Sequence, residues 1–297
     1  MSASEHGALH QKLLRSRVEY YDRVLQRLVA LNLDQCTLDF QYIRFDPNNI
    51  RKEKELAKVL VAHLVPFSLR EERLIEAESN IVNFAMLEAK SLFTKRKQSG
   101  ESGELLLYFL IEIVLGAPQV LAKMSLKTSS AMEVHGSDGV HAKLKAPGEP
   151  LDVYLGESKL HQDASTAITE ALASIDKVRR EGVDREVMLA TENFKWIDSE
   201  AKEKILQLLD PNSPSHSCRI HFVVLVGFSL PPHGNRKTKE TERDFIARYR
   251  KKTGSLRELL RTKTEGRNEP WDDIVHVFFV PFTDVERFRE DFVKWLT

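Results

Sequence analysis

Hydrophobic residues in the first third of the chain recur mainly at the spacing of an amphipathic helix. This spacing occupies residues 8–31 and returns over 50–64 and from about 70 to 95. Between the first two helical segments, residues 36–45 alternate hydrophobic and polar side chains, which predicts a strand that ends at Asp46-Pro47-Asn48-Asn49. Residues 1–98 are therefore expected to form a mainly helical N-terminal region.

The remaining two thirds, residues 99–297, alternate between helical and strand-like patterns. After the break at Gly100-Glu-Ser-Gly103, residues 105–115 are hydrophobic on nearly every side, which is typical of a buried helix. Residues 220–228 form a continuous hydrophobic run of the kind found in a strand buried on both faces. The other predicted strands are 119–126, 140–144, 151–160 and 274–282, and the other predicted helices are 163–179, 184–210, 243–252 and 284–296. This order predicts an α/β domain.

Composition excludes several classes of protein. The 297 residues include 44 basic and 44 acidic side chains, so the chain is not a mainly basic nucleic-acid-binding module, although a local basic channel is compatible with this balance. The longest hydrophobic run is interrupted by Glu112 and is far shorter than the roughly 20 residues of a membrane span. The N-terminus lacks a secretory signal, so a cytoplasmic location is expected. Cys36 and Cys218 are isolated and indicate neither a disulfide framework nor a zinc site.

The segment 151–160 carries the most informative charges. Because strand side chains alternate faces, Val153, Leu155, Glu157 and Lys159 project to the same side of the predicted strand. A carboxylate and an ammonium group that share a mostly buried face either neutralise each other or hold a ligand. From these residues alone, a surface ion pair and a metal site with a neighbouring lysine both stay open.

Two further acids precede this strand. Asp138 lies in Gly136-Ser-Asp-Gly139, a sequence typical of a turn, and the turn opens the strand next to 151–160. Glu104 occupies the first turn of the buried helix, where the helix dipole favours a negative charge. Glu112 lies two turns further on, and it is either a second acid of the site or a satisfied group in the core.

Residues 100–230 resemble the core of the PD-(D/E)xK nuclease superfamily in the order of these elements and acids. The resemblance implies a restriction-endonuclease-like fold with a mixed central sheet flanked by helices. It also implies that Asp138 and Glu157 are ligands of Mg²⁺ or Mn²⁺, that Glu104 is a third acid of the metal site, and that Lys159 orients the attacking water. A serine precedes the aspartate where that superfamily usually has proline.

Three segments are similar to the nuclease subunit of the Hachiman anti-phage defence system: residues 103–108, 135–142 and 156–160. This resemblance implies a metal-dependent DNA nuclease that works with a helicase subunit, and residues 1–98 are expected to dock that partner or to regulate the nuclease. The alternatives are a non-catalytic nucleic-acid-binding or scaffold subunit on the same fold, and a nuclease that acts on RNA. His135, His141 and His161 lie near the motifs and are interpreted as substrate contacts or packing residues rather than ligands. The basic residues of 236–252 are expected either to contact phosphate or an acidic partner, or to form a solvated face.

Overall fold

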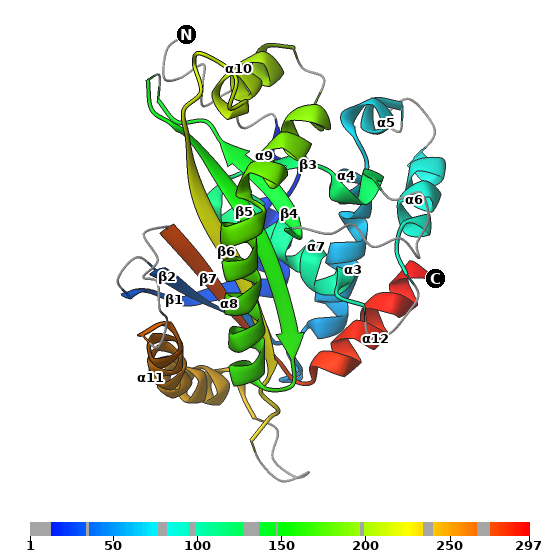
Figure 1. The fold of residues 1–297 in the computed structure, drawn as a ribbon. Coiled ribbons are helices and arrows are strands. Elements are labelled where there is room, and N and C mark those ends of the chain that lie inside the picture. Colours follow the sequence, from blue (N-terminus) through cyan, green and yellow to red (C-terminus); the bar gives the residue numbers. More distant parts are fainter. Residues whose placement is uncertain are drawn as a thin grey trace.

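One seven-stranded mixed sheet organises the chain (Figure 1). The computed structural model describes residues 13–33, 36–76, 82–94, 99–126, 137–146, 148–196, 199–233, 240–265 and 274–297. The strand order is β1-β2-β7-β6-β5-β4-β3. Their bounds are β1 Leu25–Leu33, β2 Cys36–Ile43, β3 Gln119–Leu121, β4 Gly139–Lys143, β5 Leu151–His161, β6 Cys218–Ser229 and β7 Ile274–Phe282.

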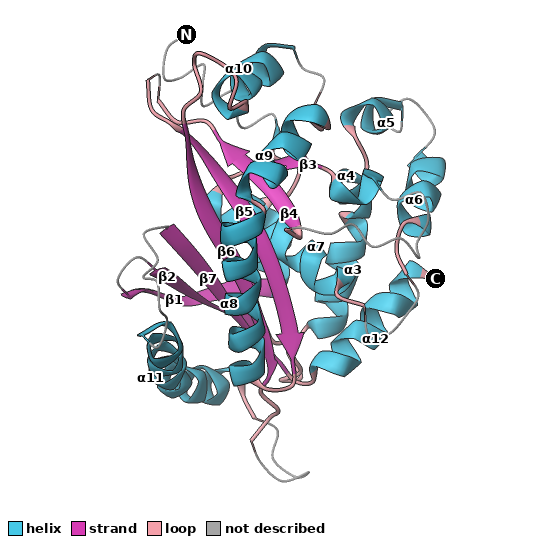
Figure 2. Cartoon of the chain, in the orientation of Figure 1, coloured by secondary structure: helices cyan, strands magenta, loops and turns pink. Residues whose placement is uncertain are grey.

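Helices cover both faces of this sheet (Figures 1 and 2). Helix α8 (Ala164–Glu181) crosses one face over β5 and β6, and α11 (Glu242–Glu265) packs beside it. Helices α3 (Glu53–Ala62), α7 (Glu101–Leu110) and α12 (Val285–Leu296) lie on the other side. The remaining helical elements are α2 Val18–Val24, α4 Leu64–Ser68, α5 Glu71–Glu76, α6 Val82–Ser91, the π-helix η2 Ile111–Leu115, the 3-10 turn η3 Lys123–Leu126, α9 Val183–Glu192 and α10 Ser199–Leu209.

The four central strands are parallel, and the hydrophobic run of β6 suits a strand that is buried on both faces. Strands β2, β7, β6 and β5 pair in parallel, whereas the outer strands β1, β4 and β3 are antiparallel to their neighbours. A parallel strand is buried on both faces, so it needs hydrophobic residues at successive positions. Residues 222–228 meet that need and are all buried. The predicted α/β class, with a mixed central sheet flanked by helices, is therefore confirmed.

The N-terminal pattern was misleading over residues 25–33. These residues continue the spacing of the preceding helix, yet the helix Val18–Val24 ends there and Leu25–Leu33 forms β1. Pairing with β2 supplies backbone hydrogen bonds along the whole strand and buries Leu25 and Leu33, which outweighs the local preference. The strand predicted over 119–126 is shorter in the structure, because β3 ends at Leu121 and η3 begins at Lys123.

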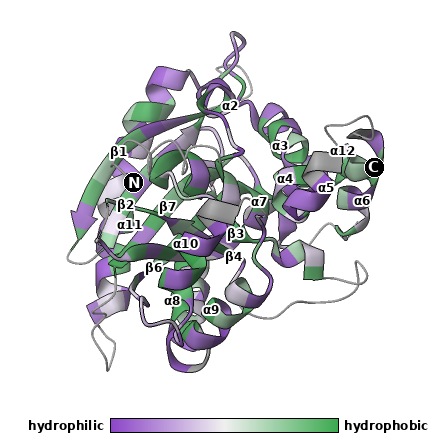
Figure 3. Cartoon of the chain, turned by 90° about the horizontal axis from the view of Figure 1, so that it is seen from above, coloured by the Kyte–Doolittle hydropathy of each residue, from purple (hydrophilic) through white to green (hydrophobic). Residues whose placement is uncertain are grey.

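The first third of the chain is thus part of the central sheet. Strand β2 pairs with β7, which lies more than two hundred residues later in the sequence. The sheet crosses the expected boundary near residue 98, and the assignment of a separate regulatory role to residues 1–98 stays a prediction. In Figure 3 the outer helices carry both hydrophilic and hydrophobic residues, as amphipathic helices packed on a sheet do. None of the described helices has the length and hydrophobicity that crossing a bilayer requires.

Glu112 joins the N-terminal segment to the core. Its buried carboxylate accepts hydrogen bonds from the backbone N–H groups of Arg15 and Ser16, at 3.1 and 2.7 Å. The nearby Lys195 ammonium is fully buried and donates to the Gln119 side chain at 2.7 Å; burial lowers its pKa to about 7. Of the two roles left open by the sequence, these contacts place Glu112 in the core, where its Oε2 accepts both hydrogen bonds and its Oε1 has no hydrogen-bond partner among the described residues.

Replacement of this carboxylate should loosen the N-terminal segment. Glu112→Ala leaves two backbone N–H groups without an acceptor and removes the negative charge near Lys195, so the free energy of unfolding should fall by about 2–4 kcal/mol. Urea denaturation of the variant measures this loss, with Glu192→Ala, an exposed acid of α9, as the control. Equal unfolding midpoints for the two variants would contradict the anchoring role.

Candidate active site

Adjacent strands bring Asp138 next to the Glu157-Ser-Lys159 segment. Gly139 of β4 is in register with Gly156 of β5, and the Asp138 N–H donates to the Gly156 carbonyl at 2.7 Å. The Ser158 backbone N–H and hydroxyl both donate to Oδ2 of Asp138, each at 2.7 Å. The predicted proximity of Asp138 to this part of β5 is therefore confirmed, and the carboxylate is fixed by two donors from one residue.

Glu157 and Lys159 project to the same face of β5, as their spacing predicts. Lys159 Nζ lies 2.8 Å from Glu157 Oε1, and the two side chains are 26% and 14% exposed. Ser158 lies between them in sequence and is turned toward the opposite face, where helix α7 packs. The pair is thus a half-buried ion pair that solvent reaches, on a strand whose preceding residues are all buried.

The charges of the site influence one another. Burial raises the pKa of Asp138 to about 6, and the negative charge of Glu157 adds to the rise, while the Ser158 donors and Lys123 oppose it. For Lys159, burial lowers the pKa, but the Glu157 ion pair and the Asp138 charge outweigh burial and leave it raised. Two carboxyl groups therefore share one electrostatic environment, and the lysine keeps its positive charge there.

Helix α7, which carries Glu104, approaches β5 very closely. The side chain of Glu104 is half-buried in the first turn of α7. The preceding residue is Gly103, and a Cβ atom placed there would lie 2.7 Å from Leu160 Cδ1 and 3.1 Å from Ser158 Oγ. Only glycine permits this approach, which sets the helix N-terminus beside the strand that carries Glu157 and Lys159.

Two charged residues near Asp138 were not identified from the sequence. Lys123, in η3, donates from Nζ to the carbonyl oxygen of Ser137. Glu186, in α9, is buried and accepts a hydrogen bond from the backbone N–H of Ser137. One signal for Glu186 was available: it lies on the hydrophobic side of its helix, together with Val187 and Ala190, where an acid is unusual.

The donor set at this site suits a hard cation. Asp138 and Glu157 offer carboxylate oxygens, the ligands that Mg²⁺ and Mn²⁺ prefer, and a cation would relieve the repulsion that raises the pKa of Asp138. Within the described ranges, no three His, Cys, Asp or Glu side chains form a ready-made metal cluster. Mg²⁺ does not require one, because it commonly binds one or two carboxylates and completes its shell with water and substrate oxygens.

The nearby histidines have other contacts. His141 is fully buried, its Nδ1 lies 2.8 Å from the Ala117 carbonyl, and its ring packs near Tyr108, so it is a packing residue. His161 Nε2 lies 2.9 Å from the Glu170 carboxylate. His135 lies outside the described residues.

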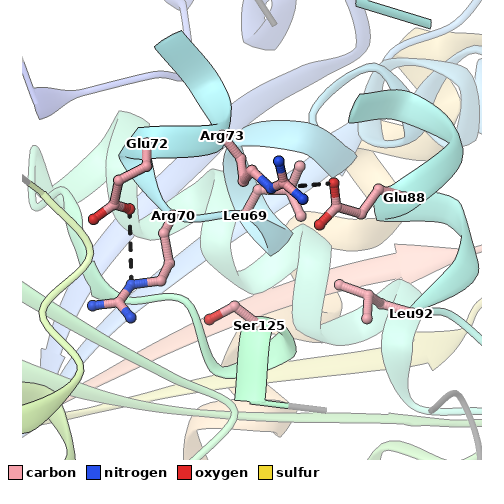
Figure 4. Close-up of a pocket in the computed structure, with 7 residues that line it drawn as sticks. All are labelled: Leu69, Arg70, Glu72, Arg73, Glu88, Leu92 and Ser125. Carbon is pink, nitrogen blue, oxygen red and sulfur yellow. Dashed lines mark ion pairs between the residues drawn. The ribbon is translucent and has the colours of Figure 1, made fainter. Parts of the chain in front are cut away.

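A separate pocket of about 430 Å³ lies between α5, α6 and η3 (Figure 4). Its charged residues are joined in pairs, with Arg70 4.0 Å from Glu72 and Arg73 3.6 Å from Glu88. Ser125 and two leucines complete the lining. The arginines already have ion-pair partners, and Asp138, Glu157 and Lys159 are not among the lining residues. This pocket is therefore separate from the candidate active site.

The fold and site together define a mixed α/β protein in which two acids and a lysine meet on adjacent strands of a helix-covered sheet. A family model described as HamA matches residues 21–296, nearly the whole chain, and the chain belongs to the HamA family. It is thus an anti-phage defence protein of the Hachiman type. None of the curated proteins compared with the chain matches it.

The contact at Gly103 provides a test of how the site is assembled. Gly103→Val inserts a branched side chain against Leu160 and Ser158, so α7 must move away from β5 and the unfolding free energy should fall by about 1–3 kcal/mol. Thermal unfolding measures the loss. Gly254→Val, at an open position of α11, serves as the control for a valine introduced into a helix. A Gly103 variant as stable as the Gly254 variant would contradict the close approach.

Proposed function

We propose that this chain is a metal-dependent DNA nuclease of the PD-(D/E)xK type and the effector of a Hachiman defence complex. The observation that carries the proposal is the meeting of Asp138 with Glu157 and Lys159 on two paired strands. Membership of the HamA family agrees with a role in defence. A nuclease is the function for which this combination of oxygen ligands and a neighbouring ammonium group is best suited.

Asp138 and Glu157 are the proposed ligands of Mg²⁺ or Mn²⁺, with Glu104 as a third acid near the site. A bound divalent cation would supply an activated water and neutralise charge on the phosphodiester. The protein's own contribution is to fix the ligands. Ser158 engages Oδ2 of Asp138 with both donors, so Oδ1 is available to a ligand.

Lys159 is the proposed group that holds the water or a phosphate oxygen. Its ion pair with Glu157 and the charge of Asp138 keep the ammonium protonated, so it offers N–H donors and not a base. A protonated lysine next to an incoming phosphate attracts the substrate and stabilises the charge that develops on it. The partial exposure of Glu157 and Lys159 allows a polymer to reach both residues.

The metal site is tested by single substitutions. Asp138→Ala and Glu157→Ala each remove a proposed ligand, so cleavage of plasmid DNA in Mg²⁺ should fall at least about 100-fold, and EDTA should abolish cleavage by the unaltered chain. Thermal unfolding establishes that the variants fold, and Glu192→Ala is the matched acidic control. Full cleavage by either variant would refute the assignment, and cleavage of RNA with DNA left intact would identify the other substrate.

A basic surface on α11 is the proposed contact for the DNA backbone. The surface consists of exposed basic residues distributed around α11 that form no ion pair within the described ranges: Arg243, Arg250, Lys251, Lys252 and Arg257. Arg248, expected to belong to this surface, is instead held by the Glu240 carboxylate at 2.6 and 2.8 Å. The expected basic residues of 236–239 lie outside the described part of the chain.

Charge reversal distinguishes phosphate binding from a solvated face. Arg250→Glu with Lys251→Glu should weaken DNA binding at least about tenfold and reduce the slope of log K against log salt by roughly 1–2, because each lost phosphate contact lowers the counterion release. Fluorescence anisotropy in EDTA at several salt concentrations measures both quantities. Lys54→Glu with Lys58→Glu on α3 makes the same change in net charge and should have little effect. Equal effects of the two double variants would favour a general charge effect.

The proposed partner is the helicase subunit of the same defence system, which keeps the nuclease inactive until DNA engages the complex. A nuclease with no sequence preference would damage the cell's own DNA unless it were restrained. Helix α6 provides a candidate docking surface, because Phe84 and Leu87 are 72% and 63% exposed. Large exposed hydrophobic residues on one helix are typical of a protein interface.

Partner control predicts that the isolated chain cleaves DNA weakly and that the complex with DNA cleaves at least about tenfold faster. Phe84→Ser with Leu87→Ser should abolish binding of the helicase subunit, because the exposed hydrophobic contact is lost. Gel filtration of the mixed subunits and plasmid cleavage measure the two effects, with Met188→Ser, an exposed residue of α9, as the control. Vigorous cleavage by the chain alone, unchanged by the partner, would contradict the restraint.

A further inference from the structure

The backbone of Ser137 is held at both of its polar groups, and its carbonyl group belongs to the peptide that precedes Asp138. Ser137 is buried, and its carbonyl oxygen accepts a hydrogen bond from Lys123 Nζ. Its N–H group donates to the carboxylate of Glu186. Because Ser137 and Asp138 are consecutive, the orientation of this peptide sets the direction in which the Asp138 side chain leaves the backbone.

The two charged residues belong to elements that are themselves tied to the sheet. Lys123 follows β3 directly and begins η3. Helix α9, which carries Glu186, ends beside the same strand: the Lys195 backbone N–H donates to the Val120 carbonyl at 2.9 Å, and Phe194 forms an isolated bridge with Leu121. Both charged side chains therefore reach Ser137 from elements that are attached to β3.

These contacts are what stabilises the burial of the Glu186 side chain. The residue is 2% exposed, and among the described residues its Oε2 atom has no hydrogen-bond partner. Burial of an acid in this way costs free energy. Burial raises the pKa of Glu186, the Lys123 charge and the Ser137 N–H oppose the rise, and the Glu157 charge adds to it. Glu186 therefore lies within the electrostatic reach of the site.

We propose that Glu186, acting with Lys123, is a positioning residue: the two side chains hold the N–H and the carbonyl oxygen of Ser137, and thereby fix the Asp138 carboxylate against Ser158. The inference rests on the proposed function only for the chemical role of Asp138. Glu186 itself does not touch substrate in this proposal. The Glu186 carboxylate is needed as the acceptor for the Ser137 N–H group. The amide oxygen of glutamine also accepts a hydrogen bond, so Glu186→Gln should preserve this contact.

Two backbone amides report directly on this clamp. The Asp138 N–H donates to Gly156 O, and the Ser158 N–H donates to the Asp138 carboxylate. If the Ser137 peptide rotates, both bonds weaken while the rest of the sheet keeps its pairing. Hydrogen exchange at these amides can be measured by NMR without divalent cations or DNA, and so independently of any cleavage.

Four variants of the full chain test the proposal. Glu186→Ala should raise exchange of the Asp138 and Ser158 amides about tenfold, which corresponds to the loss of one buried hydrogen bond. Glu186→Gln should stay within about threefold of the unaltered chain, because its amide retains the acceptor. Glu192→Ala, an exposed acid of α9, should match the unaltered chain. Lys123→Met should raise exchange at the same two amides, and it provides the test if Glu186→Ala does not fold.

The outcomes separate positioning from general stability. Exchange at Val224 and Val226 of the central strand β6 should remain unchanged in every variant that supports the proposal. Unaltered exchange at Asp138 and Ser158 in the Glu186→Ala and Lys123→Met variants would overturn it, as would an equal rise across β6 or a glutamine variant as impaired as alanine. A Mg²⁺ titration by calorimetry should also show weaker binding for Glu186→Ala than for Glu186→Gln. If the exchange results hold and the unaltered chain cleaves no nucleic acid, the proposed function fails while the positioning role stands.

Discussion

The structure depends on the way that β5, an interior strand, carries ionised side chains just beyond the residues that pair with β4. β5 has strands on both sides and helices on both faces, so a charge on it loses much of its hydration. Each charge is compensated locally: Lys159 pairs with Glu157, and the Ser158 donors satisfy Asp138 from the neighbouring strand. Such burial favours a folded state with one arrangement of the charges, because an incorrect arrangement would leave an uncompensated charge.

The two faces of the sheet differ around β5. On one face, α7 packs so closely that its Gly103 has no room for a side chain, and Ser158 points toward it. The other face carries Glu157 and Lys159, which remain accessible to solvent. Because side chains alternate along a strand, three consecutive residues can include one that packs against a helix and two that are accessible to solvent. A loop could not hold the charges in this relation without additional support.

The N-terminal third contributes both to the core and to the surface. Its β2 strand pairs with β7, and its first described residues are held by Glu112. The family match over residues 21–296 includes β1 and β2 as well as the candidate site. The same region exposes Phe84 and Leu87 on α6. The first third of the chain therefore supplies strands of the central sheet as well as exposed hydrophobic side chains.

The sequence by itself determined the features that follow from local periodicity. A continuous hydrophobic run predicted the buried strand at 220–228, and the period of two placed Glu157 and Lys159 on one face beside the strand opened by Asp138. Tertiary structure decided the features that depend on distant partners. Residues 25–33 fit a helical spacing and become a strand because β2 is available to pair with them. The partners of Glu112, Arg248 and Glu186 come from other segments of the chain. The role of a buried acid depends on the hydrogen-bond donors that the fold brings to it, and a local sequence pattern does not contain that information.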